Sequence, residues 1–293
     1  MKRKLSGILF GLLFLTGFGI LVYPTVSNQW NTYRQSRLIS DYEKVVSDMK
    51  PEDYTEEWEA AREFDSTLVQ NNIYGDVFGS DDTQIEDTDY WKVLNVAEDG
   101  IMGYLSIPKI NVRLAIYHGT AEDVLQTGIG HMNGTSLPIG GESTHSVLAA
   151  HRGLPAARLF TDIDQMQQGD MFYIHVLDET LTYEVDQILV VKPYQIEALE
   201  IDAKQDYVTL VTCTPYGVNS HRLLVRGRRV EAASNGFPNT SDVTAVEDTP
   251  KQSTWMVKYW EGIRNGLFIF LLIMTLLLVL TLLTKKLRKR KRP

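Results

Sequence analysis

Two long apolar runs stand near the ends of the chain, and the segment between them has a different pattern. The first run extends from Leu5 to Tyr23, and the second extends from Ile263 to Leu283 with a single charged residue, Arg264. Each run contains about 20 residues, enough for a helix to cross the ~30 Å hydrocarbon core of a bilayer. The pattern therefore predicts two membrane-spanning helices that flank a central domain.

Basic residues lie on the outer side of both runs. Three precede the first run, and seven follow the second within residues 285–293. Lys and Arg beside a span stay on the cytoplasmic side, so both termini are predicted to be cytoplasmic and the central segment extracytoplasmic. The first run could instead be a cleaved signal peptide, although no clear small-residue cleavage site stands before Pro24. In either case the second run would hold the domain at the membrane.

Between the runs, the pattern is first helical. Residues 28–70 are strongly charged, and Trp58, Ala61, Phe64 and Leu68 recur every three to four residues. This spacing predicts a helix with one apolar stripe that packs on the main domain.

A short segment between two glycines follows the helix. Gly75-Asp76-Val77-Phe78-Gly79 encloses a small hydrophobic tip, and an acidic stretch continues from there to Asp89. Glycines on both sides of a tip indicate a loop with movable ends. The acidic stretch lacks the glycine and the closing glutamate of an EF-hand, so a solvated loop is favoured over a calcium site.

From Gly103 onward the pattern is typical of β-structure, with short runs of Val, Ile, Leu and Tyr separated by turn residues. Strands are predicted near 103–107, 112–117, 128–131, 145–150, 171–176, 181–191, 207–213 and 222–230. Short helices are predicted after Thr120 and over 158–166. Many strands with few helices between them indicate a closed barrel or a sandwich, not a βαβ fold.

The predicted organisation follows from these patterns. It comprises a signal-anchor segment (1–24), a helical segment (25–74), a loop and acidic connector (75–102), a β domain (103–230), a linker (231–258), a membrane helix (259–284) and a basic tail (285–293). The segment between the spans carries a net charge of about −18. Such a surface argues against binding nucleic acid.

The only cysteine of the chain, Cys213, stands at the end of an apolar strand, Tyr207-Val-Thr-Leu-Val-Thr-Cys213, just before a Pro/Gly turn. Strand ends beside loops hold reactive groups rigidly and leave them accessible. An exported protein with one cysteine cannot use it for an internal disulfide. The residue is therefore an inert buried thiol, an intermolecular bridge or a nucleophile.

Two further polar residues stand at strand ends. Arg222 opens the next strand nine residues after Cys213, and His151 ends the apolar run that begins at Ser146. In a hairpin, the guanidinium would approach the sulfur, favour the thiolate and hold an oxyanion. A histidine so placed is either structural or a proton donor and acceptor. Apart from His151 and His221, the histidines show no metal-ligand spacing and are predicted to be structural: His118, His131, His145 and His175.

These residues carry a resemblance to a known family. Thr209-Leu-Val-Thr-Cys213, with Arg222 nine residues later and Ala150-His151 upstream, resembles the signature of the sortases, surface transpeptidases of Gram-positive bacteria. The stretches 103–110 and 116–120 are also similar, so the resemblance covers roughly residues 55–230. It implies an eight-stranded β-barrel with His151, Cys213 and Arg222 as the catalytic residues.

The second span and the long N-terminal helical segment resemble the pilin-polymerising branch, class C. Members of that class carry a lid, typically Asp-Pro followed by an aromatic residue, and Asp76-Val77-Phe78 stands at the corresponding place. The resemblance implies that Asp76 pairs with Arg222 and that Phe78 covers Cys213. Val77 replaces the usual proline, which puts the stiffness of the lid in question. Asp89-Tyr90-Trp91 is the alternative lid.

The resemblance also implies an activity. Substrates would be pilin subunits with a C-terminal sorting signal of the Leu-Pro-x-Thr-Gly type, cleaved between Thr and Gly and joined to an acceptor pilin lysine. No metal or organic cofactor is implied. Three alternatives stay open: a surface cysteine protease that uses water in the second step, a housekeeping sortase that accepts a cell-wall precursor amine, and a non-enzymatic adhesin.

Overall fold

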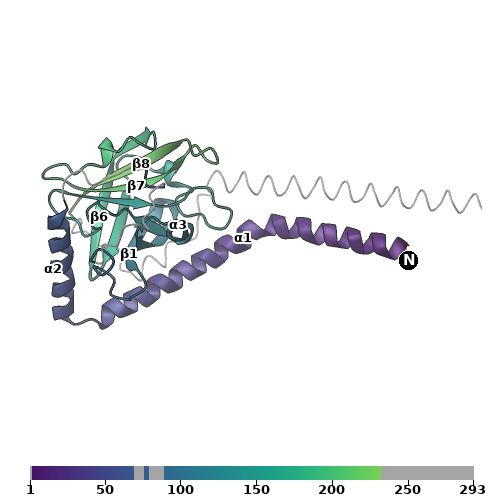
Figure 1. Ribbon diagram of the computed structural model, residues 1–293, viewed down its shortest axis with the longest axis horizontal. Helices are drawn as coiled ribbons and strands as arrows, with labels where there is room; N and C mark the ends of the chain where they lie inside the picture. The colour runs from purple at the N-terminus through teal and green to yellow at the C-terminus, as the bar shows by residue number, and fades with distance from the viewer. Residues whose placement is uncertain (1, 69–75, 79–88, 232–293) are drawn as a thin grey trace, which may run out of the picture. The chain divides into compact units, whose positions relative to one another are not determined.

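The strands form a closed barrel, one of the two architectures that the short apolar runs indicate and the one that the sortase resemblance implies. The computed structural model describes residues 2–68, 76–78 and 89–231, and these include eight strands. The strands are β1 (Ile101–Ile107), β2 (Val112–His118), β3 (Ile129–His131), β4 (Thr144–Ala149), β5 (Met171–Val176), β6 (Glu179–Val191), β7 (Asp206–Thr214) and β8 (His221–Arg229). Their order around the barrel is β1-β2-β3-β4-β7-β8-β6-β5, and β5 pairs with β1 to close it. Figure 1 shows the barrel with β1, β6, β7 and β8 labelled.

The strand pairing places segments that are distant in sequence beside one another. Strand β4 pairs in parallel with β7, which in turn forms an antiparallel ladder with β8. The burial pattern of β7 is almost continuous, because one face fills the barrel and the other is covered by loops and short helices. The ends of β4, β7 and the start of β8 therefore meet at one rim of the barrel.

Two helices precede the barrel: α1 (Lys2–Asp48) and α2 (Pro51–Thr67). Helix α2 begins with Pro51 in its first turn, where a missing N–H costs nothing, and the Asp53 carboxylate accepts a bond from the Lys50 N–H at 3.0 Å. Trp58 and Ala61 are buried in the main core, and Phe64 packs against it. Three of the four predicted stripe residues thus pack on the main core, whereas Leu68 lies just beyond the end of α2, and the predicted helical segment is divided between α1 and α2.

Helix α1 docks on the outside of β1 and β2. Ile39 and Tyr42 are buried there. The Gln35 side chain accepts a hydrogen bond from the N–H of Ala115 at 2.9 Å and donates one to the carbonyl of Thr127 at 2.7 Å. Within the described part of the chain, the segment Gly11–Asp48 of α1 is long and apolar enough to cross a membrane, a property shared by signal sequences near an N-terminus.

The shorter elements complete the fold. They are α3 (Glu122–Thr127) and the 3-10 turns η2 (Pro108–Ile110), η3 (Ile163–Gln165) and η4 (Glu197–Leu199). The helix expected over 158–166 is wrong, since only the single turn η3 forms there. Helix α1 continues without interruption past residue 24. The chain divides into units Met1–Phe237 and Pro238–Pro293, and the second, with the expected membrane helix and basic tail, lies outside the described residues.

Candidate active site

Cys213 and Arg222 face each other across the ladder between β7 and β8. They are direct register partners, because the turn between the two strands joins Thr214 to His221. The Cys213 side chain is only 7% exposed and the Arg222 side chain is similarly buried. Main-chain hydrogen bonds therefore fix the thiol and the guanidinium beside each other at the barrel rim.

Three influences act on the pKa of the Cys213 thiol. Burial raises it most, the positive charge of Arg222 lowers it, and the negative charge of Asp76 raises it again. The net direction is upward, so the structure holds a thiol that ionises less readily than a free cysteine. Since only the thiolate is nucleophilic, this arrangement lowers the reactivity of Cys213.

All three guanidinium nitrogens of Arg222 make polar contacts. Its Nε donates to one carboxylate oxygen of Asp76 at 2.8 Å, and its Nη2 forms an ion pair with the other. Its Nη1 donates to the carbonyls of Asn219 and His221 at 3.1 and 3.0 Å. The contact with Asp76 is bidentate, the geometry in which a guanidinium binds a carboxylate most specifically.

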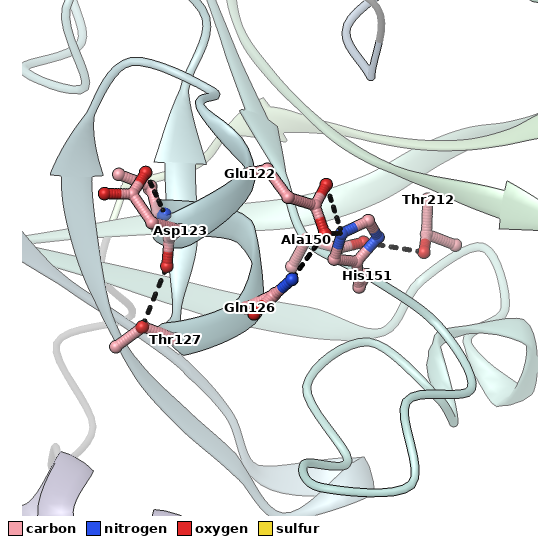
Figure 2. A network of polar contacts seen from close by, with 8 residues as sticks. Glu122, Asp123, Gln126, Thr127, Ala150, His151 and Thr212 are labelled. Carbon is pink, nitrogen blue, oxygen red and sulfur yellow. Dashed lines mark hydrogen bonds and ion pairs between the residues drawn. The ribbon is translucent and has the colours of Figure 1, made fainter.

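His151 directly follows β4 and is brought to the same rim by the β4–β7 pairing. The N–H of Ala150 donates to the carbonyl of Val211 at 3.2 Å, and the Thr212 hydroxyl donates to the carbonyl of Ala150 at 2.8 Å. These two bonds connect Ala150 to β7, the strand that carries Cys213, and His151 is the next residue in the chain (Figure 2).

The three loop residues 76–78 lie across this rim. The Phe78 ring stacks on His151, with centroids 5.5 Å apart, and the Arg222 guanidinium lies 5.1 Å from the Phe78 centroid. Val77 is 3% exposed and packs into a cluster that includes Val147 and Leu224. The structure thus brings together all five residues singled out from the sequence: His151, Cys213, Arg222, Asp76 and Phe78.

The alternative lid, Asp89-Tyr90-Trp91, lies elsewhere. Tyr90 is fully buried in the main core, where its hydroxyl bonds to His131 Nδ1 at 2.9 Å and accepts the N–H of Gly119. Asp89 forms an ion pair with Lys92. The carboxylate on Arg222 belongs to Asp76 instead.

Four histidines occupy structural positions. Burial lowers the pKa of His131, His145 and His175 to about 4 and lowers that of His118 as well. Each bonds to backbone carbonyls or hydroxyls, as in the contact of 2.7 Å between His145 and Thr209. In the described ranges no cluster of three or more His, Cys, Asp or Glu side chains could hold a metal ion.

Two charged neighbours of His151 were not singled out from the sequence. Glu122, on α3, has both carboxylate oxygens 3.3 Å from His151 Nε2. Arg152 donates to the carbonyl of Thr161 at 3.1 Å and to Asp164 at 2.5 Å, which holds the loop after His151. No local pattern marks either residue: the Glu122 contact joins α3 to the segment after β4, and the Arg152 contacts depend on how the loop after His151 folds back.

Comparisons with known proteins agree with this geometry. Residues 105–230 match the model of the sortase domain. The chain is 50% identical to sortase C1 of Streptococcus agalactiae over 67% of its own length and 100% of that structure, with a TM-score of 0.61. The chain belongs to the sortase family.

This sortase is similar to further solved members of one class. It is 45% identical to sortase C-1 of Actinomyces oris, covering 61% of this chain and 99% of that structure with a TM-score of 0.58. The neighbours place it in class C. Sortase D of Bacillus subtilis is 29% identical over 131 residues, and the match spans 44% of this chain and 63% of that relative.

Proposed function

We propose that this sortase is a pilin-polymerising cysteine transpeptidase whose catalytic residues are Cys213, His151 and Arg222. The observation that carries the proposal is the cross-strand pairing of the single cysteine with a buried arginine, beside a half-buried histidine at the same barrel rim. A nucleophile, a directed cationic donor and a proton carrier are the groups that acyl transfer through a thioester requires.

In the first half-reaction, the Cys213 thiolate attacks the Thr carbonyl of a sorting signal of the Leu-Pro-x-Thr-Gly type. Arg222 donates to the oxygen of the tetrahedral intermediate, where its planar N–H groups stabilise the developing negative charge. His151 gives a proton to the departing Gly amine as the C–N bond breaks. The acyl group then remains on Cys213 as a thioester.

In the second half-reaction, the amine of a pilin lysine attacks the thioester. His151 takes a proton from the amine, the C–S bond breaks, and an isopeptide bond forms while Cys213 leaves as the thiolate. The choice of pilin as the substrate rests on likeness to class C. Sortase C of Streptococcus pneumoniae, 44% identical over 67% of this chain and 97% of that structure with a TM-score of 0.59, is a protein with pilin substrates.

Residues 76–78 act as a lid in this proposal. Asp76 occupies the two guanidinium donors that an oxyanion needs, and Phe78 lies against both His151 and Arg222. Substrate can bind only when these contacts open, so the closed state lowers the apparent affinity by the fraction of time that the site is open.

The proposed location is the outer face of the cell membrane. The apolar half of α1 would anchor the chain, and the basic residues at both ends of the sequence would keep the termini cytoplasmic. A tethered enzyme meets membrane-bound substrates at high effective concentration.

The test is mass spectrometry of the full-length enzyme in detergent with a Leu-Pro-x-Thr-Gly peptide and a lysine peptide. We expect a thioester adduct on Cys213 followed by an isopeptide product. Release of the free acid alone, with the lysine peptide present in excess, would identify a protease instead. Product formed only with a cell-wall precursor amine would identify a housekeeping sortase.

A further inference from the structure

In the proposed mechanism His151 transfers a proton, and this requires that its imidazole ring be held in one orientation. Glu122 is the first residue of α3, and its two carboxylate oxygens are equidistant from His151 Nε2, at 3.3 Å. Figure 2 shows the Glu122 carboxylate on one side of the imidazole and Thr212 of β7 on the opposite side. The nitrogen that contacts Glu122 is Nε2, which leaves Nδ1 as the ring nitrogen available for proton transfer.

The carboxylate is held where it is by the fold. Gln126, one turn later on α3, donates to Glu122 Oε1 at 2.8 Å. Leu125 anchors the same helix in the apolar cluster beneath the lid, and the carbonyl of Thr127 accepts the Gln35 side chain of α1. The contact with His151 thus joins two rigidly placed segments.

The backbone of His151 is fixed independently of Glu122. Its carbonyl accepts the N–H of Phe160 at 3.2 Å, and the preceding carbonyl, of Ala150, accepts the Thr212 hydroxyl. The backbone position leaves the side chain free to rotate about its own bonds. Only a contact on the ring can select one orientation, and the ring contacts are the Phe78 stack and the Glu122 carboxylate.

We propose that Glu122 is a positioning residue for His151, an inference that rests on the proposed function. A carboxylate on one ring nitrogen fixes both the tautomer and the orientation of an imidazole. With Nε2–H donating to Glu122, Nδ1 is the atom that gives a proton to the Gly amine and takes one from the lysine amine. Glu122 also stabilises the imidazolium present before the first transfer and after the second.

The other charged groups near His151 do not serve this purpose. Arg222 and Asp76, behind the Phe78 ring, neutralise each other in a bidentate pair. Arg152, in the loop that follows, is paired with Asp164. Burial leaves the Cys213 thiol with a raised pKa, which disfavours a negative charge there. Glu122 is the charged side chain in direct contact with the imidazole in the part of the chain that the structure describes.

The exposure of the Glu122 side chain determines how large a loss of activity its removal should cause. The Glu122 side chain is 67% exposed, so water and salt screen its charge. We therefore expect about a tenfold loss of kcat on its removal, well below the ~10⁴-fold cost of removing the buried aspartate of a serine protease. Because Glu122 does not touch substrate in this role, KM should change little.

The experiment compares Glu122→Gln, Glu122→Ala and Glu122→Asp in the full-length enzyme that also carries Asp76→Ala and Phe78→Ala, so that lid opening does not limit the rate. The matched control is Asp123→Asn, on the same turn, whose carboxylate bonds to the Val124 N–H at 2.9 Å. Steady-state transpeptidation and single-turnover thioester formation are measured across a range of pH, and thermal unfolding checks that each variant is folded.

We expect Glu122→Gln and Glu122→Ala to lose about tenfold in kcat at unchanged KM, and Glu122→Asp to recover part of that loss. Asp123→Asn should stay within about twofold of its parent.

The proposal is overturned if Glu122→Gln keeps the kcat of its parent, or if Asp123→Asn loses as much activity. Nitrogen NMR of the His151 ring gives a readout that needs no substrate. We expect the Nε2–H tautomer in the parent and a larger share of the Nδ1–H tautomer in Glu122→Ala; an unchanged tautomer refutes the contact. If the parent forms no thioester at all, the proposed function fails, and the NMR result still decides the role of Glu122.

Discussion

The candidate site combines two regions that the fold holds in different ways. Cys213 and Arg222 lie in adjacent strands, where the ladder of main-chain hydrogen bonds fixes their separation. Asp76, Val77 and Phe78 lie in no strand or helix, and the contacts described for them with the barrel are the Asp76–Arg222 ion pair and the packing of Val77 and Phe78. Segments with few contacts open at a much lower free-energy cost than core strands. In the proposed function, the rigid strands carry the catalytic residues, and the loop of residues 76–78 controls access to them.

The electrostatics of the two regions oppose each other. Arg222 lowers the pKa of the Cys213 thiol, and Asp76, from the loop, raises it. The same loop residue also occupies the donors that Arg222 would offer to an oxyanion. In the proposed mechanism, the Asp76 carboxylate therefore disfavours the Cys213 thiolate and occupies Arg222 at the same time, so opening the loop should relieve both effects.

The largest effect is expected for Cys213→Ala in the rigid region. Removing the sulfur removes the atom that carries the covalent intermediate, so pilin polymer and thioester adduct should both be absent. The barrel should stay folded, since alanine fits the buried position with a small cavity. Polymer ladders on immunoblots and the unfolding temperature are the measurements. Ladder formation above a few per cent of wild type would show that Cys213 is not the nucleophile.

Arg222→Lys should follow, with a loss of about 10²–10³ in the rate of thioester formation. Lysine keeps the charge but cannot present two fixed, parallel donors. The measurement is single-turnover thioester formation. It is best made with Asp76→Ala in both enzymes, because the Lys variant would also loosen the ion pair of the lid. A near-normal rate for the Lys variant would leave the oxyanion without the proposed partner.

Removing the lid by Asp76→Ala and Phe78→Ala should change the rate in the opposite direction. Loss of the Asp76 charge lowers the pKa of Cys213, so the thiolate fraction at a fixed neutral pH rises. We expect at least a tenfold faster reaction with a small thiol reagent, and a pH profile displaced to lower pH. The matched control is Asp89→Ala with Trp91→Ala in the alternative segment, which should leave the rate unchanged. Equal rates for the lid variant and wild type would mean that residues 76–78 do not restrain the site.

The sequence predicts the rigid region better than the contacts around it. A nine-residue spacing across a Pro/Gly turn is enough to make Cys213 and Arg222 cross-strand neighbours, and the strand positions are local signals. The approach of His151 to Cys213 depends on parallel pairing between β4 and β7, some 60 residues apart, which no local pattern specifies. Only the family resemblance supplied it.

The contact between Glu122 and His151 was still harder to predict from the sequence. A helix start near residue 120 could be predicted, but which of its side chains faces the rim depends on how α3 packs under Leu125 and against Gln35. Likewise, the burial of Val77 follows from the closed barrel and not from its own neighbours in sequence. Tertiary packing decides such contacts, and the sequence records them only indirectly.

The smallest expected effect tests how the movable region is held. Val77 stands where class C resemblance implies a proline, and it packs against Val147 and Leu224. Val77→Ala removes two methyl groups from that contact, worth roughly 1 kcal/mol. The closed loop should lose that stabilisation while the open loop does not, so the open fraction rises about fivefold.

Thiol reactivity of Val77→Ala should therefore rise by about the same factor, while the unfolding temperature barely changes, because the loop opens without the barrel. Val176→Ala, in β5 and fully buried in the main core, is the control with the opposite signature. It should lower the unfolding temperature and leave thiol reactivity as it was, since its cavity lies away from the loop. If Val77→Ala lowers the unfolding temperature as much as Val176→Ala does and leaves the thiol no more reactive, Val77 belongs to the rigid region, and the Asp76–Arg222 ion pair and the Phe78 contacts hold the loop.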